Sequence, residues 1–220
     1  MSATRIPHTP VLLAGRVIAV LRAEHASEYP RVIDSLIRGG VTSIELTLST
    51  RGVFEQLPAL VAHVGAVGEV GVGTVTTRGQ AETAIAAGAA FIVTPVMSLD
   101  VIDVCTEAGV PVYPGGLTPT EIHQGWVRGA SAVKVFPAAT VGAGYVSQLR
   151  GPFPDLEVIP SGGVDAIAAV EWMRAGAVAV SVGGPLLGDA FAGGAPAALV
   201  ERAHRLSETI KEVVAGRSAR

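Results

Sequence analysis

One sequence pattern recurs along the chain and constrains the fold more than any other feature: a helical segment, a glycine, and then a short apolar strand. A glycine just past a helix end adopts the left-handed conformation without the penalty that a Cβ imposes, so each of these glycines ends a helix. Gly88, Gly109 and Gly129 lie about one short strand–helix unit apart, which indicates a repeated architecture. This sequence pattern occurs at residues 38–48, 87–93, 108–113, 128–136 and 175–182.

Eight apolar segments of strand length alternate with helical segments, which predicts an all-parallel sheet. Hydrophobic residues make up 49% of the chain and aromatic residues only 5%, a composition that suits strands covered by helices on both faces. Eight is also the number of strands that closes into a barrel, so we expect residues 1–220 to form a single (β/α)8 TIM barrel. An open doubly wound sheet is the alternative, but no Gly-x-Gly-x-x-Gly motif follows the first strand. The expected strands are 16–21, 42–48, 67–73, 90–93, 111–113, 131–136, 156–160 and 177–182, and the expected helices include 27–38, 77–87, 99–108, 119–128 and 197–214.

Charge and cysteine content argue against several classes of protein. The formal net charge is −3 and the charged residues are scattered, so no basic stripe indicates nucleic-acid binding. We expect no membrane span and no signal peptide, because no apolar stretch has the required length and flanks. The one cysteine, Cys105, excludes an intrachain disulfide and favours a reducing, cytoplasmic location. The five histidines are far apart in the sequence, which therefore gives no support to a metal site.

Side chains along a strand alternate in direction, and this places a glutamate and a lysine inside the predicted barrel. In the second strand the apolar side chains must meet the helices, which leaves Glu45 and Thr47 in the interior. In the sixth strand Lys134 and Phe136 face inward by the same argument. Functional residues of a barrel collect at the C-terminal ends of its strands. We therefore expect Glu45 and Lys134 to project into the same space.

Lys134 is the strongest single indication of a functional site in the sequence. The chain has only two lysines; Lys211 lies on the polar face of the last helix, whereas Lys134 lies within Ala-Val-Lys-Val-Phe-Pro. Taking its ammonium group out of water is costly unless the group is paired or deprotonated. One interpretation is a structural ion pair with Glu45. The other, which we favour, is an amine that burial keeps partly neutral and therefore nucleophilic, with Glu45 as the carboxylate that carries protons.

Glycine pairs follow the last two predicted strands. Gly162 and Gly163 come directly after Ser161, and Gly183 and Gly184 follow the eighth strand. In many barrels the loops after these two strands bind a phosphate group through backbone N–H groups. The two pairs together predict a phosphate-binding site.

Six motifs resemble those of the 2-keto-3-deoxy-6-phosphogluconate aldolase family, in order from about residue 17 to residue 186. The resemblance implies a class I aldolase on a (β/α)8 barrel that needs no metal and no cofactor. It further implies a cytoplasmic homotrimer that acts in carbohydrate metabolism, in the Entner–Doudoroff pathway. The motifs are Gly-Gly-Val-Thr-Ser-Ile-Glu-Leu-Thr-Leu (39–48), Val-Gly-Thr-Val (72–75), Phe-Ile-Val-Thr-Pro (91–95), Val-Lys-Val-Phe-Pro-Ala (133–138), Gly-Pro-Phe-Pro (151–154) and Ser-Gly-Gly-Val (161–164).

The resemblance also implies roles at the matching positions. Lys134 would form a Schiff base with a keto-acid substrate, and Glu45 would be the general acid/base. Thr74 and Pro95 would hold the pyruvate carboxylate and the bound chain. The remaining implied substrate contacts are Phe136 and Ser161, with Gly162, Gly163, Gly183 and Gly184 around the phosphate.

Two departures from the family pattern concern substrate binding. Many members carry an arginine four residues after the glutamate to clamp a carboxylate, and this chain has Ser49 there. The clamp must then come from elsewhere, from Arg22 or Arg51, and we expect Arg22 because it follows the first strand. Pro185 stands where many members have serine, and it offers neither a hydroxyl nor a backbone N–H.

The expected reaction is cleavage of a 2-keto-3-deoxy-6-phospho-sugar acid to pyruvate and glyceraldehyde 3-phosphate. An aldolase for 4-hydroxy-2-oxoglutarate or for an unphosphorylated 2-keto-3-deoxy acid is the alternative within the same chemistry. Another phosphate-binding barrel enzyme, such as a decarboxylase or epimerase, would not need a lone lysine among valine and phenylalanine. A non-catalytic barrel that serves as a binding module would not need both Glu45 and Lys134.

Overall fold

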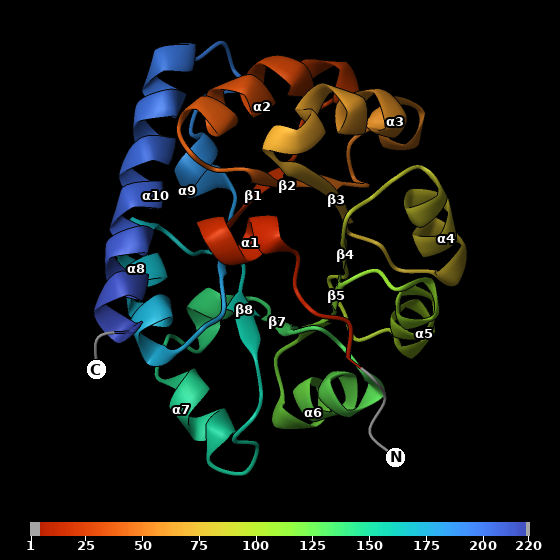
Figure 1. Ribbon diagram of the computed structural model, residues 1–220, viewed down its shortest axis with the longest axis vertical. Coiled ribbons are helices and arrows are strands. Elements are labelled where there is room, and N and C mark those ends of the chain that lie inside the picture. Colours follow the sequence, from red (N-terminus) through yellow and green to blue (C-terminus); the bar gives the residue numbers. More distant parts are fainter. Residues whose placement is uncertain (1–4, 219–220) are drawn as a thin grey trace.

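The structure is a computed structural model that describes residues 5–218, with short parallel strands at its centre and helices around them (Figure 1). Six strands form one parallel sheet in the order β5-β4-β3-β2-β1-β9, and three form a second in the order β6-β7-β8. The predicted parallel α/β fold is therefore confirmed. The strands are β1 (Val17–Leu21), β2 (Ser43–Thr47), β3 (Glu69–Gly73), β4 (Ile92–Val93), β5 (Val112–Tyr113), β6 (Gly115–Gly116), β7 (Val133–Val135), β8 (Val158–Pro160) and β9 (Val180–Val182).

The helices begin and end where capping residues and glycines predict. The Thr118 side chain accepts a hydrogen bond from the Glu121 N–H, and the Glu121 side chain accepts one from the Thr118 N–H. This reciprocal pair is a capping box, and it starts α6. Gly109 and Gly129 adopt left-handed conformations directly after α5 and α6. The helices are α1 (Pro10–Gly15), α2 (Tyr29–Arg38), α3 (Val53–Val64), α4 (Arg78–Ala86), α5 (Leu99–Ala108), α6 (Pro119–Arg128), α7 (Tyr145–Arg150), α8 (Ala166–Ala175), α9 (Gly184–Leu187) and α10 (Pro196–Ser218), with 3-10 turns η1 (Ala26–Glu28), η2 (Gly65–Val67) and η3 (Ala138–Thr140).

The predicted fifth strand, 111–113, is observed as β5, and β6, which the sequence did not predict, follows directly after Pro114. β5 pairs with β4, and β6 pairs with β7. Proline has no N–H to donate to a strand ladder, and the Pro114 carbonyl accepts a hydrogen bond from the Lys134 N–H of β7. The chain therefore passes from the six-stranded sheet into the three-stranded sheet without leaving the parallel arrangement.

Backbone hydrogen bonds join the two sheets at both edges. On one side the Ser131 N–H donates to the Val112 carbonyl at 3.0 Å, and the Lys134 N–H donates to the Pro114 carbonyl at 2.8 Å. On the other side the Val178 N–H donates to the Val158 carbonyl at 3.0 Å. The parallel sheet is therefore curled, because strands at its two ends approach the same short sheet.

Alternate residues of the strands separate into two apolar clusters. Val133 and Val135 belong to a large cluster with the helices, whereas Ala132 belongs to a smaller one that includes Ile159. Leu12 of α1 joins the smaller cluster, and α1 lies across the centre of the strands in Figure 1. Burying one such aliphatic side chain contributes about 1.5–3 kcal/mol, so both clusters fix the direction of the residues between them. This alternation turns Lys134 away from the helices, as the sequence predicts.

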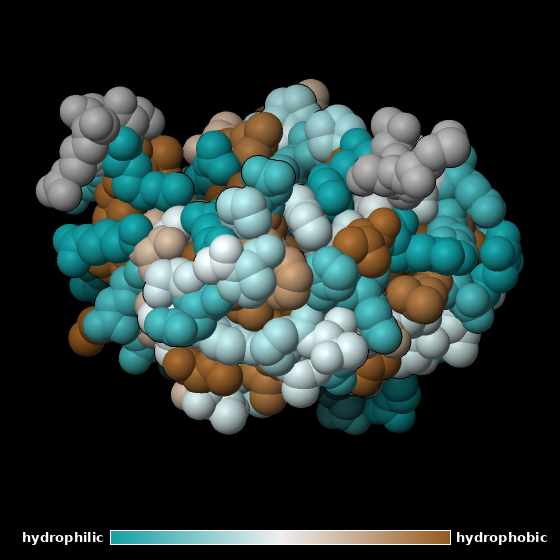
Figure 2. Space-filling model, turned by 90° about the horizontal axis from the view of Figure 1, so that it is seen from below, coloured by the Kyte–Doolittle hydropathy of each residue, from teal (hydrophilic) through white to brown (hydrophobic). Residues whose placement is uncertain are grey.

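The surface carries few large apolar side chains. Val67, Val96, Val127 and Ile167 are the most exposed of those in residues 5–218. Figure 2 shows one face of the molecule, on which apolar residues form small groups among hydrophilic ones. Within the described residues no helix is both long enough and apolar enough to cross a membrane.

Candidate active site

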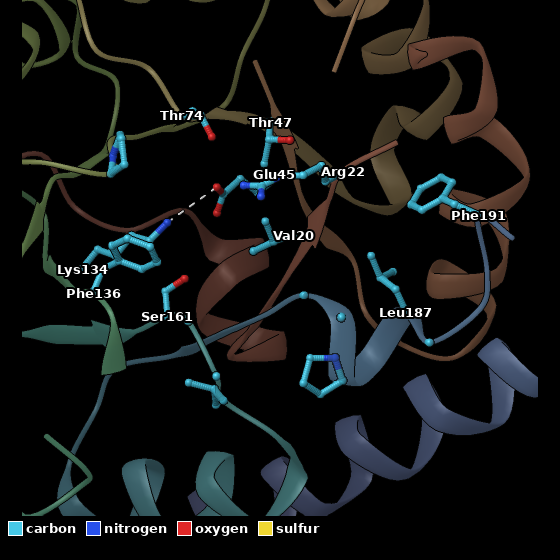
Figure 3. A pocket seen from close by; sticks show the side chains of 18 of the residues that line it. Val20, Arg22, Glu45, Thr47, Thr74, Lys134, Phe136, Ser161, Leu187 and Phe191 are labelled. Atoms are coloured by element: carbon cyan, nitrogen blue, oxygen red, sulfur yellow. Dashed lines mark ion pairs between the residues drawn. The ribbon is translucent and has the colours of Figure 1, made fainter. Parts of the chain in front are cut away.

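A pocket of about 640 Å³ opens at the C-terminal ends of the strands (Figure 3). The carboxyl ends of parallel strands meet at one edge, so residues distant in the sequence converge there. The structure brings to this pocket Arg22 and every residue to which the family resemblance assigns a role. They are Lys134, Glu45, Arg22, Thr74, Pro95, Phe136, Ser161, Gly162, Gly163, Gly183 and Gly184.

Lys134 and Glu45 face each other across the pocket. The Lys134 Nζ lies 3.8 Å from the Glu45 Oε1, and the two side chains are 9% and 1% exposed. The same Nζ lies 5.4 Å from the centroid of the Phe136 ring, within the range of a cation–π interaction. At 3.8 Å the amine and the carboxylate attract each other without a direct hydrogen bond, and proton transfer between them can pass through one bridging water.

The environment of Glu45 is a poor one for a purely structural ion pair. Its second carboxylate oxygen, Oε2, is buried and has no hydrogen-bond partner among residues 5–218. A buried ion pair contributes to stability only where hydrogen bonds satisfy the remaining lone pairs. Unsatisfied buried groups in native proteins are few, and a catalytic role is one of the explanations for them. The arrangement therefore favours a carboxylate held for chemistry over a counter-ion held for stability.

Gly73 makes room for the Glu45 carboxylate. Gly73 ends β3 and pairs with Thr47 of β2, two residues beyond Glu45. A Cβ at Gly73 would meet the Glu45 Oε1 and would lie 2.5 Å from the Glu45 Cδ. The carboxylate occupies this position only because residue 73 has no side chain.

Thr74 adopts a backbone conformation that is unusual for its type. Its φ is +62°, in the left-handed region that β-branched residues almost never occupy. Strain of this kind persists only where the surroundings enforce it, and it clusters at functional sites. Thr74 lines the pocket together with Glu45 and Lys134 (Figure 3).

The loop after β8 packs tightly on the other side of Lys134. Ser161 is buried, and its hydroxyl donates to the Ser181 hydroxyl at 3.3 Å. Gly162 has a φ of +86°, and a Cβ there would lie 2.9 Å from the Phe136 ring. Glycine at this position therefore allows the loop after β8 to approach Phe136.

The structure distinguishes between the two candidate carboxylate clamps. Arg22 follows β1 and lines the pocket, and its side chain extends toward Glu45 and Thr47 (Figure 3). Arg51 instead forms an exposed ion pair with Glu24 at 2.6 Å and is not among the pocket residues. Ser49 donates a hydrogen bond to the Thr47 hydroxyl at 3.1 Å. Arg22 is therefore placed to meet an anion in the pocket.

One end of the pocket was not anticipated from the sequence. It is built by α9 and the segment after it, where Leu187 and Phe191 contribute apolar surface (Figure 3). The position of this segment directly after the last strand was the only available signal. The further lining residues without a predicted role are Val20, Thr47, Val164, Pro185, Gly188 and Ala192.

In residues 5–218 no group of three or more histidine, cysteine, aspartate or glutamate side chains could hold a metal ion. The pocket residues with ionisable side chains are Lys134, Glu45 and Arg22.

Comparisons with known proteins find related aldolases. A family model described as KDPG and KHG aldolase matches residues 9–193. The 2-dehydro-3-deoxy-phosphogluconate aldolase of Pseudoalteromonas atlantica is 30% identical over 216 residues, which cover 96% of each chain. A probable 2-dehydro-3-deoxy-6-phosphogalactonate aldolase of Rhizobium meliloti is 32% identical over 83% of this chain and 85% of its own. Among solved structures, the KDPG aldolase of Legionella pneumophila, with pyruvate captured as a covalent carbinolamine, superimposes with a TM-score of 0.82. It is 26% identical, and the match covers 90% of this chain and 96% of that one.

Proposed function

The chain belongs to the KDPG and KHG aldolase family, and from this membership we propose that it cleaves a 2-keto-3-deoxy-6-phospho-sugar acid to pyruvate and glyceraldehyde 3-phosphate. The chain is thus a lyase of the class I, Schiff-base type. The observation that carries the assignment of residues is the placement of Lys134 Nζ 3.8 Å from the Glu45 carboxylate in the pocket.

In the proposed reaction the Lys134 amine adds to the C2 carbonyl of the substrate and water leaves, which gives a protonated imine. The imine accepts electrons while Glu45, directly or through water, removes the proton of the C4 hydroxyl. The C3–C4 bond then breaks, the aldehyde departs, and an enamine remains on Lys134. Protonation of the enamine and hydrolysis of the imine release pyruvate and restore the amine.

The binding roles follow from position along the pocket. Arg22, with Thr74 and Pro95, is assigned to the keto-acid carboxylate and the carbons next to it. Phe136 and Ser161 are assigned to the bound chain around Lys134. Gly162, Gly163, Gly183 and Gly184 are assigned to the phosphate, because backbone N–H groups after the last two strands face the pocket in this type of fold.

Trapping with pyruvate tests this mechanism. Sodium borohydride should reduce the imine with pyruvate to a stable adduct on Lys134, found by peptide mass spectrometry. Lys211 is the internal control, since its Nζ pairs with Glu208 on the surface of α10. An adduct confined to Lys211 or to the N-terminus would contradict the mechanism. EDTA should leave the cleavage rate unchanged, and activity restored by a divalent ion would indicate a different, metal-dependent reaction.

We also propose that residues 1–220 form one domain in which the curled sheet closes as a (β/α)8 barrel. The pairing of β6 with β7 supports this closure, as do the backbone hydrogen bonds from Ser131 to Val112, from Lys134 to Pro114 and from Val178 to Val158. The family resemblance supports a homotrimer that acts in the cytoplasm, in the Entner–Doudoroff pathway. Sedimentation equilibrium of the purified protein would test the trimer.

A second substrate class is favoured by one end of the pocket. Pro185 offers no N–H or hydroxyl to a phosphate, and Leu187 and Phe191 add apolar surface near it. An unphosphorylated 2-keto-3-deoxy acid or 4-hydroxy-2-oxoglutarate, cleaved by the same Lys134 chemistry, is therefore the alternative. Comparison of kcat/KM values for the phosphorylated and unphosphorylated acids decides between them.

A further inference from the structure

Hydroxyl groups hold the main chain on both sides of Arg22. On the N-terminal side the Leu21 carbonyl accepts hydrogen bonds from the Thr47 hydroxyl at 3.0 Å and from the Tyr29 hydroxyl at 3.3 Å. On the C-terminal side the Thr50 hydroxyl accepts from the Ala23 N–H at 3.1 Å and donates to the Ala23 carbonyl at 3.1 Å. Both peptide groups that flank Arg22 are therefore tied to buried side chains.

These hydroxyls are buried although the residue between them is exposed. Thr47, Thr50 and Tyr29 are buried, whereas the Arg22 side chain reaches the surface of the pocket. Burial raises the pKa of Tyr29 to about 12, so its hydroxyl remains a donor at neutral pH. The three groups form a rigid support in which each donor has a fixed acceptor.

The support lies beneath the one guanidinium of the pocket. Lys134 and Arg22 are the two basic side chains among the lining residues, and Lys134 is consumed in the imine of the proposed mechanism. Within residues 5–218 Arg22 has no ion-pair partner closer than 4.0 Å, so its charge is available to a ligand. A guanidinium recognises a carboxylate through two parallel hydrogen bonds, which demand an accurate position.

We propose that the hydroxyls of Thr50 and Tyr29 are positioning groups, which fix the backbone at Arg22 so that its guanidinium meets the carboxylate of the keto-acid substrate. This inference rests on the proposed function, because it assumes a carboxylate next to the carbon that Lys134 attacks. Thr50 and Tyr29 do not line the pocket, so they act through Arg22 and not on the substrate.

The test is a double-mutant cycle between Thr50 and Arg22, read as steady-state cleavage of 2-keto-3-deoxy-6-phosphogluconate. Thr50→Val keeps the shape of the side chain and removes both hydrogen bonds to Ala23. Loss of hydrogen bonds of ordinary net strength should raise KM about 3- to 10-fold. The kcat should stay within about twofold of wild type, because the lost interaction is the same in the ground and transition states. Thr50→Ser, which retains the hydroxyl, should restore KM.

The coupling separates positioning from a general loss of stability. In an Arg22→Ala background Thr50→Val should not raise KM further, because the group that it positions is gone. Tyr29→Phe provides a second variant should Thr50→Val fail to fold, and the same increase in KM is expected. Thr83→Val is the matched control, since it removes a hydroxyl-to-carbonyl hydrogen bond to Gly79 in α4, away from the pocket. Its KM should equal that of wild type.

Three results would overturn the proposal: an unchanged KM in folded Thr50→Val and Tyr29→Phe, an equal rise of KM in the Arg22→Ala background, or no rescue by Thr50→Ser. Pyruvate trapping distinguishes these from failure of the proposed function. If wild-type protein gives no borohydride adduct on Lys134, the aldolase mechanism itself is wrong. If wild type and Thr50→Val both give the adduct while KM is unchanged, only the positioning role is wrong.

Discussion

Replacing Gly73 by alanine should displace the Glu45 carboxylate without altering any ionisable group. The added Cβ would lie 2.5 Å from the Glu45 Cδ and 2.7 Å from its Cγ, and the Oε1 would be closer still. Since real Cβ contacts do not fall below 3.0 Å, the Cδ must retreat by at least 0.5 Å, and the oxygen by more. A misplacement of about 1 Å at a reacting group lowers the rate by about 10²-fold. That loss corresponds to about 2.7 kcal/mol in the activation free energy.

The assay is release of pyruvate measured continuously with lactate dehydrogenase and NADH, at saturating substrate so that kcat is obtained. Gly79→Ala is the matched control, because a Cβ there meets nothing within 4 Å and the residue lies in the first turn of α4. This control should keep wild-type kcat and thermal stability. Circular dichroism of both variants establishes that they are folded. A folded Gly73→Ala enzyme with wild-type kcat would refute the conclusion that Glu45 must occupy this position.

Three further predictions follow from the same site and from the opposite end of the strands. Glu45→Gln should remain folded but lose about 10²–10⁴ in kcat, the range for a positioned acid/base; an unfolded variant whose folded fraction is fully active would make Glu45 a structural counter-ion. Pro185 removes one hydrogen-bond donor to the phosphate, but the four glycines remain. We therefore expect measurable kcat/KM values for phosphorylated and unphosphorylated 2-keto-3-deoxy acids, with the higher value for the phosphorylated acid. A higher kcat/KM for the unphosphorylated acid would contradict this. The hydrogen bond from His8, at 2.7 Å, lowers the pKa of Glu157 below its usual 4.5. The carboxylate therefore stabilises the fold above about pH 4.5, and this contribution disappears as the pH falls through the lowered value. Urea unfolding should show Glu157→Gln less stable than wild type at pH 7 and equal to it near pH 2; equal stability at both pH values would argue against the interaction.

Much of the fold could be predicted because its signals are local. A glycine that ends a helix and a side chain that alternates along a strand act over a few residues, so Gly109, Gly129 and the inward direction of Lys134 were predictable. The strand β6, directly after Pro114, and its pairing with β7 were not predicted from the sequence. Pairing depends on which strands are neighbours, and the chain near Pro114 does not specify that.

In the candidate site, too, local patterns predicted some features and not others. The sequence alone placed Glu45 and Lys134 on inward-facing positions and marked Ser161 and the glycine pairs at strand ends, because alternation and strand order suffice for this. It favoured Arg22 over Arg51 as the clamp, and of these two the structure places only Arg22 in the pocket. Loop segments that follow different strands meet through the curl of the sheet, which no local pattern encodes.

The sequence by itself therefore determined which side chains point inward and in which order their strands follow one another. Only the tertiary structure decided the 3.8 Å separation of Lys134 and Glu45, the space left by Gly73, the left-handed backbone of Thr74 and the apolar wall at Leu187 and Phe191. The physical reason is that direction along a strand is set by the backbone of that strand. Distances across a pocket depend instead on strand register and on the packing of helices around the whole sheet.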